Sequence, residues 1–101
     1  MINYGRQFID DDDIEAVLDT LKSDFLTQGS KVPDFENALC ERVNAKFAVA
    51  ANSATSALHL ACLAIDIKEG DIVWTAPNTF VASSNCALYC GAKVDFVDID
   101  E

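Results

Sequence analysis

Three short apolar runs alternate with two longer helical patterns through the second half of the chain. The apolar runs cover residues 47–51, 72–75 and 94–97, and the helical patterns cover residues 54–65 and 79–89. Parallel strands need crossover connections, and a helix between two strands supplies one. The alternation therefore predicts an α/β fold with a mostly parallel sheet and flanking helices.

Two further helices are predicted ahead of the first apolar run. Asp12 and Glu15 have the spacing of a capping box. One helix face then carries Ile14, Val17, Leu18 and Leu21. A second helix begins near Pro33, a residue favoured in the first turn, and Asn44 can end it in a left-handed conformation. The segment between them, residues 22–30, has no clear period, and such loops often carry binding residues.

Charge and cysteine content exclude several classes of protein. Seven basic and seventeen acidic residues give a formal net charge of −10, so no basic surface is expected for nucleic acid or an anionic membrane. No apolar run approaches the roughly 18 residues of a membrane span, and the first residues lack a signal-peptide core. We expect a cytoplasmic protein. The four cysteines have no CxxC pair and no zinc-site spacing, which predicts free structural thiols and no metal site.

The junction between the first predicted strand and its helix reads Asn52-Ser53-Ala54-Thr55. Free N–H groups at a helix N-terminus and the positive end of the helix dipole favour anions, typically a phosphate. Small residues let an anion approach the backbone, and the hydroxyls of Ser53 and Thr55 can add donors. The simpler interpretation is that Ser53 only caps a buried helix. The pattern by itself leaves both interpretations open.

Six short motifs follow one another along the chain. They are LTQG at 26–29, FENAL at 35–39, NSATSAL at 52–58, EGDIV at 69–73, TFVAS at 79–83 and GAKVDFVDID at 91–100. In this order they resemble the DegT/DnrJ/EryC1/StrS family of sugar aminotransferases, over nearly the whole chain. Within that family, the details are most similar to the transaminases of pseudaminic acid biosynthesis. The nucleotide-binding motifs GxxxxGK[ST] and GxGxxG are absent.

The resemblance implies the N-terminal part of a type I pyridoxal-phosphate-dependent transferase fold. Residues 1–31 would form an N-terminal helix and a substrate-contacting segment, and residues 32–101 the start of a truncated large domain. The implied reaction uses pyridoxal 5′-phosphate to move an amino group from glutamate to C4 of a UDP-linked 4-keto-6-deoxy-N-acetyl hexose, in a homodimer with shared active sites. In this fold residues 47–51 would not pair with residues 72–75.

Residue roles follow from the same resemblance. Ala54 and Thr55 would donate backbone N–H groups to the cofactor phosphate, with Ser53 in the same turn and the Thr55 hydroxyl as a further donor. Phe80 would lie against the pyridine ring, where an aromatic face gives stacking worth about 1 kcal/mol. The alternative for Phe80 is a core position on the helix over residues 79–89. His59 lies a full turn inside an apolar helix, and a hydrogen-bonded structural histidine is expected there.

The resemblance also implies a set of contacts to the nucleotide sugar. The residues concerned are Tyr4, Asp24, Phe25, Leu26, Thr27 and Ala54. For Tyr4, the alternative is a terminal residue without a fixed position.

The catalytic residues are expected beyond Glu101. Pyridoxal catalysis needs a Schiff-base lysine and a carboxylate that keeps the ring nitrogen protonated, and the lysines of this chain lie on predicted helix surfaces, turns or a strand start. A three-strand parallel sheet would also leave bare edges, so we expect the N-terminal part of a longer protein that is inactive in isolation. The alternatives that stay open are another nucleotide-sugar aminotransferase or a dehydratase of the same family, and a stand-alone α/β module of the flavodoxin or receiver type.

Overall fold

The computed structural model describes residues 5–100 of the chain. It contains two units, Met1–Val49 and Ala50–Glu101, and each is described here by itself. The predicted division after residue 31 is based on function, because it separates a segment expected to contact the substrate from a segment expected to bind the cofactor. It stays a prediction, since a division by contacts does not test roles.

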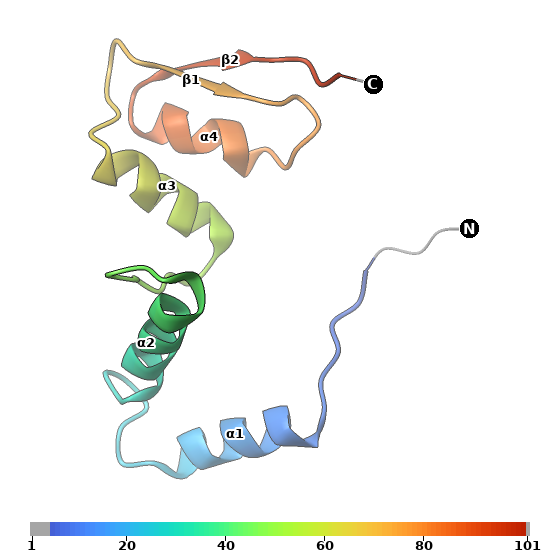
Figure 1. Ribbon diagram of the computed structural model, residues 1–101, viewed down its shortest axis with the longest axis vertical. Helices are drawn as coiled ribbons and strands as arrows, with labels where there is room; N and C mark the ends of the chain where they lie inside the picture. The colour runs from blue at the N-terminus through green and yellow to red at the C-terminus, as the bar shows by residue number, and fades with distance from the viewer. Residues whose placement is uncertain (1–4, 101) are drawn as a thin grey trace. The chain divides into compact units, whose positions relative to one another are not determined.

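The first unit begins with helix α1, Asp11–Lys22 (Figure 1). Its capping box is formed by Asp10, whose side chain accepts from the Asp13 N–H at 3.2 Å, and by Asp13, whose side chain accepts from the Asp10 N–H at 3.1 Å. The predicted pair Asp12 and Glu15 is therefore wrong by two residues. The cause is the run of four aspartates, any of which can cap a helix, and the first one in the run does so.

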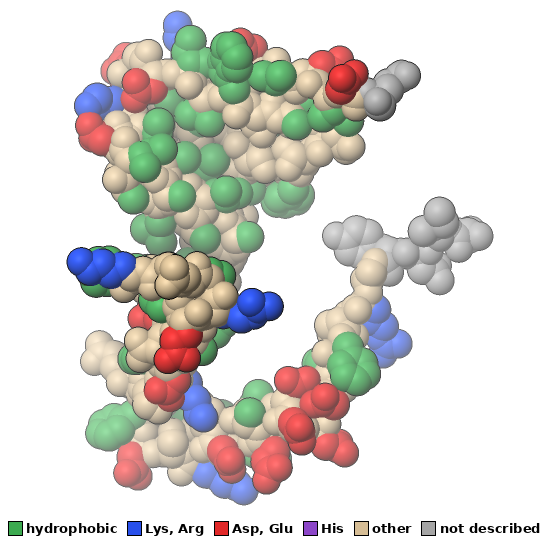
Figure 2. Space-filling view, in the orientation of Figure 1, with side chains coloured by type: hydrophobic (Ala, Val, Ile, Leu, Met, Phe, Trp, Pro, Cys, Tyr) green, Lys and Arg blue, Asp and Glu red, His purple; other side chains and the backbone are tan. Residues whose placement is uncertain are grey.

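Helix α2, Lys31–Val43, is the second element of this unit. It starts two residues before the predicted Pro33, which becomes the third helical residue, where an N–H still has no intrahelical acceptor. Asn44 ends the helix in the left-handed conformation, with φ 53° and ψ 41°, which confirms that prediction. Acidic side chains gather along α1 in Figure 2, and three of them, Asp11–Asp13, lie in its first turn, where the helix dipole favours them.

The second unit contains two helices and a parallel sheet. Its elements are α3, Ala54–Ala64; β1, Ile72–Thr75; α4, Ala82–Tyr89; and β2, Lys93–Phe96. The strands pair in parallel, with Ile72 opposite Lys93 and Thr75 opposite Phe96. Helix α4 packs against both strands and α3 packs against α4 (Figure 1). The predicted strand–helix–strand crossover is confirmed.

Two predicted elements differ from the structure. Residues 47–51 form no strand. Within residues 5–100 the sheet contains only β1 and β2, and an extended segment without backbone hydrogen bonds to a neighbouring strand does not count as a strand. That these residues do not pair with β1 stays a prediction, since residues 47–49 belong to the first unit and β1 to the second. Helix α4 starts at Ala82 rather than at Thr79, since the Ser83 and Ser84 N–H groups bond to Phe80 and Val81 in a separate turn. Phe80 therefore lies just ahead of the helix.

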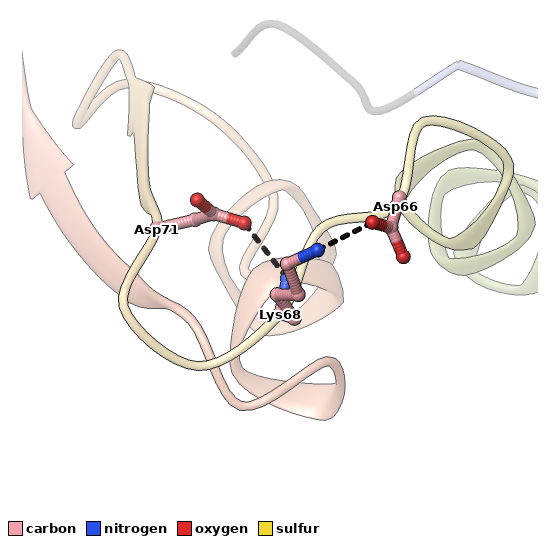
Figure 3. A network of polar contacts seen from close by, with 3 residues as sticks. All are labelled: Asp66, Lys68 and Asp71. Atoms are coloured by element: carbon pink, nitrogen blue, oxygen red, sulfur yellow. Dashed lines mark hydrogen bonds and ion pairs between the residues drawn. The ribbon is translucent and has the colours of Figure 1, made fainter.

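A tight turn connects α3 to β1. The Asp71 carboxylate accepts a hydrogen bond from the Lys68 N–H at 3.0 Å, and the Lys68 ammonium pairs with Asp66 (Figure 3). Gly70 has φ 101°, a conformation that favours glycine. Gly91 follows the C-cap residue Cys90 with φ 79°, a conformation typical of a glycine that ends a helix. These turns fix where each strand begins.

The core of the second unit is built from small residues. Among the described residues the buried apolar side chains are Cys62, Ala82, Cys86, Ala87 and Ala92. On the sheet, Val73 and Thr75 are half-buried while Trp74 stays 68% exposed, so α4 covers one face. Hydrophobic side chains show on the surface in this region (Figure 2).

All four cysteines carry free thiols, as predicted. Between Gly5 and Asp100 no group of histidine, cysteine and acidic residues is arranged to hold a metal ion. Within the same residues no helix has the length and apolar character of a membrane span.

The buried Cys62 predicts a loss of stability at alkaline pH. Burial, and after it the neighbouring thiols of Cys86 and Cys90, raise the pKa of the Cys62 thiol to about 11 from an ordinary 9.0. The unfolded thiol loses its proton at the lower pH, so between these values the unfolded state binds fewer protons and rising pH favours it. The free energy of unfolding, measured with urea, should fall across this window. In Cys62→Ala the fall should be smaller, and an identical pH profile would contradict the assignment.

Candidate functional site

The start of α3 is capped by its own serines. The Ser53 hydroxyl accepts from the Ser56 N–H at 3.2 Å, and the Ser56 hydroxyl donates to the Asn52 amide oxygen at 2.7 Å. The capping interpretation of Ser53 is therefore confirmed. The N–H groups of Ala54 and Thr55, at the first two helical positions, have no intrahelical acceptor. The cap leaves these two donors for an anion, so capping and anion binding are compatible here.

Thr55 and Phe80 line the same hollow, although they are 25 positions apart in the sequence. This Thr55–Phe80 hollow has a volume of about 230 Å³. It is lined by Thr55, Phe80, Val81, Ala82, Asn85 and Tyr89. The Phe80 side chain is 74% exposed, so the core alternative for this residue is wrong. The exposed ring offers a face to a ligand in the hollow.

The hollow carries no charged side chain of its own. Its lining is neutral, and the positive end of α3, in whose first turn Thr55 lies, borders it. No lysine and no carboxylate belongs to the residues that line it. The helix dipole of α3 is therefore the electrostatic feature of this hollow that would attract an anion.

Sequence reasoning missed four residues of this hollow, two of which, Asn85 and Tyr89, carry polar side-chain groups. These two follow Val81 at intervals of four, so the three share one side of α4. The signal that could have identified Asn85 is its amide, which stands among the small and apolar residues of this helix. Tyr89 also meets His59 of α3 edge-on, with ring centroids 5.3 Å apart and planes at 62°. Among the described residues this ring contact takes the place of the hydrogen bond expected for His59.

The predicted substrate segment forms a loop between α1 and α2. Phe25 and Leu26 are exposed, and Asp24 and Phe25 border a hollow of about 260 Å³ within the first unit. Leu26 and Thr27 do not line that hollow, and Tyr4 lies outside the described residues. The roles proposed for these residues stay predictions. A larger hollow of about 520 Å³ runs along the apolar side of α1 and includes none of the predicted site residues.

Gly29 sets the shape of this loop. A methyl group at its Cα would lie 2.6 Å from the Phe25 carbonyl oxygen, closer than real contacts of that kind allow. Gly29→Ala therefore forces the backbone at Phe25 to move. We expect the free energy of unfolding to drop by about 1–3 kcal/mol, the usual cost of overpacking. Gly5→Ala is the matched control, because nothing lies within 4 Å of that position. Equal unfolding midpoints in urea for the two variants would refute the close approach.

Comparison with known proteins identifies the chain's relatives. The sequence pattern of the DegT/DnrJ/EryC1/StrS aminotransferase family matches residues 7–101. A UDP-4-amino-4,6-dideoxy-N-acetyl-beta-L-altrosamine transaminase of Campylobacter jejuni is 56% identical over 99 residues, which are 98% of this chain and 26% of that protein. The chain thus spans about a quarter of the length of the curated relatives it matches.

Solved structures agree in fold. Helicobacter pylori PseC, an aminotransferase involved in the biosynthesis of pseudoaminic acid, matches with a TM-score of 0.89 and 38% identity, over 97% of this chain and 27% of that one. A candidate sugar aminotransferase of Streptococcus pneumoniae, solved in its PLP-form, matches with a TM-score of 0.90 and 32% identity, over 98% of this chain and 25% of that one. The expected fold class is confirmed.

Proposed function

The chain belongs to the DegT/DnrJ/EryC1/StrS aminotransferase family, and from that membership we propose that it supplies the phosphate-binding part of a pyridoxal-phosphate-dependent aminotransferase acting on a nucleotide-linked keto-sugar. The observation that carries this proposal is the shared hollow of Thr55 and Phe80. The two residues were assigned to opposite ends of one cofactor, and only a fold that brings them together lets a single ligand reach both. The PLP-form of the pneumococcal relative supports the choice of cofactor.

The hollow and the adjoining start of α3 fit a bound phosphate. Ala54 and Thr55 offer N–H donors at the positive end of α3, and the Thr55 hydroxyl adds another. In the proposed site Ser53 acts through its cap, which holds the first turn in the conformation that presents those donors. The hollow is smaller than the roughly 300–1,000 Å³ of typical ligand pockets, which suits part of a ligand, and we assign it the phosphate beside Thr55 and the adjoining part of the pyridine ring beside Phe80.

Phe80 has a different role in the proposed site. Its exposed ring would cover one face of the pyridine ring and keep water from that face. When bound, pyridoxal phosphate supplies the electron sink on which amino-group transfer depends. The residues of this chain bind and orient that group.

The finer substrate assignment rests on the relatives. The Campylobacter protein, 56% identical, is named for a UDP-linked diamino sugar, and PseC for pseudoaminic acid biosynthesis. We therefore propose a UDP-linked 4-keto-6-deoxy-N-acetyl hexose as acceptor and glutamate as amino donor, in a cytoplasmic homodimer. The loop that carries Asp24, Phe25, Leu26 and Thr27, together with Tyr4 and Ala54, is proposed to contact the nucleotide sugar.

Cofactor binding tests the proposed role of Thr55. Thr55→Val keeps the shape of the side chain and removes the hydroxyl. Since a hydrogen bond to a charged group is worth about 1.5–3 kcal/mol, the dissociation constant for pyridoxal 5′-phosphate should rise by roughly tenfold or more. The complete gene product is dialysed against the cofactor, and the amount of bound cofactor is measured by absorbance. Thr20→Val, whose hydroxyl bonds to Ala16 within α1, is the control. Wild-type protein that binds no cofactor would refute the proposed function.

Amino transfer tests the proposed substrate. With glutamate as donor, the encoded protein should aminate the UDP-linked 4-keto-6-deoxy-N-acetyl hexose with the highest kcat/KM among related sugars. The informative comparison is the same UDP-linked 4-keto sugar without its N-acetyl group, since only the acyl amide differs. Equal kcat/KM for both sugars would contradict the finer assignment and leave the aminotransferase itself in place. Formation of 2-oxoglutarate is the measured quantity.

A further inference from the structure

Asn85 is a polar residue that the proposed function has not used. Its side chain is half-buried and lines the Thr55–Phe80 hollow, and it makes no hydrogen bond to any residue between Gly5 and Asp100. A carboxamide can donate two hydrogen bonds and accept two more. A half-buried amide with no protein partner is free to bond to water or to a ligand in the hollow.

The two serine hydroxyls near Asn85, at the start of α4, already have hydrogen-bond partners. The Ser83 hydroxyl lies 2.9 Å from the Thr79 hydroxyl, and the Ser84 hydroxyl donates to the Val81 carbonyl at 2.9 Å. Both bonds serve to start the helix. Asn85, one residue further on, takes part in that start only through its backbone N–H, which bonds to Val81. Its amide is therefore not needed for local structure.

The contact between α3 and α4 brings this amide near the start of α3. His59 and Tyr89 meet edge-on, and each lies one helical turn beyond a residue of the hollow, namely Thr55 on α3 and Asn85 on α4. Thr55 and Asn85 consequently border the same space from two helices. The free N–H groups at the start of α3 and the Asn85 amide are then donors around one neutral hollow.

We propose that Asn85 is a further phosphate-binding residue, whose side-chain N–H donates to a phosphate oxygen of pyridoxal 5′-phosphate in the Thr55–Phe80 hollow. This rests on the proposed function, since it uses the same ligand and the same hollow. A phosphate has more acceptor sites than the Ala54 and Thr55 groups can fill, so a donor on α4 has an oxygen to bind. The amide, unlike a lysine, adds no charge, which leaves the helix dipole as the main electrostatic attraction.

Two aspartate substitutions test the proposal. Asn85→Asp replaces the donor by a carboxylate of the same shape, which repels the phosphate, whereas Ser84→Asp puts the same charge one residue away, outside the residues that line the hollow. Dissociation constants for pyridoxal 5′-phosphate and for pyridoxal, which lacks the phosphate, are measured by equilibrium dialysis on the protein as its gene encodes it. We expect N85D to weaken binding of the phosphorylated ligand by more than tenfold and binding of pyridoxal by less than twofold, with S84D close to wild type.

Asn85→Ala keeps the test decisive if the aspartate variant does not fold. It removes the donor without adding charge and suits a helix, and the loss of one hydrogen bond to a charged group predicts a rise of about tenfold or more in the dissociation constant. Equal affinities in N85A, S84A and wild type would overturn the proposal and leave the proposed function standing. An equal loss for both ligands would also overturn it, because the contact would not be to the phosphate. Wild-type protein that binds neither ligand would instead refute the proposed function.

Discussion

The packing of α3 against α4 is the interaction on which the candidate site depends. Thr55 opens α3 and Phe80 lies just ahead of α4, so the two border one hollow only while these helices stay in contact. Small buried residues, Cys62 on α3 and Ala82, Cys86 and Ala87 on α4, make up most of the core here and let the helices approach closely. The edge-on ring contact between His59 and Tyr89, a residue of the hollow, adds a specific contact between the two helices. A change in this interface would therefore alter ligand binding without touching a ligand-binding residue.

The sheet holds α4 in place from its other side. Two parallel strands in fixed register carry α4 on one face, and the turns at Gly70 and Gly91 determine where the strands start. The other face leaves Ile72 and Trp74 exposed. The hollow thus lies at a helix–helix interface that is supported by a sheet, between the first turn of α3 and one side of α4. This arrangement favours anion binding, because the positive end of α3 and the donors of its first turn point to the same region.

The sequence predicted the second unit better than the first, for physical reasons. The alternation of short apolar runs with helical patterns was enough to predict α3, β1, α4 and β2, although α4 begins three residues later than predicted. The capping residue of α1 was misplaced because four consecutive aspartates all satisfy the local rule. Residues 47–51 were predicted as a strand from composition, but a strand also needs a partner, which local sequence does not specify. In the candidate site, Thr55 and Phe80 followed from family resemblance. Asn85 and Tyr89 did not, since their place depends on which side of α4 faces α3.

The central claim is that the first turn of α3 binds the phosphate of a cofactor whose pyridine ring lies against Phe80. A crystal structure of the encoded protein with pyridoxal 5′-phosphate tests it most directly. The account predicts phosphate oxygens within hydrogen-bond distance of the Ala54 and Thr55 N–H groups and of the Thr55 hydroxyl, with the pyridine ring against Phe80. A cofactor whose phosphate is bound elsewhere in the protein, with the Thr55–Phe80 hollow filled by other side chains, would contradict it.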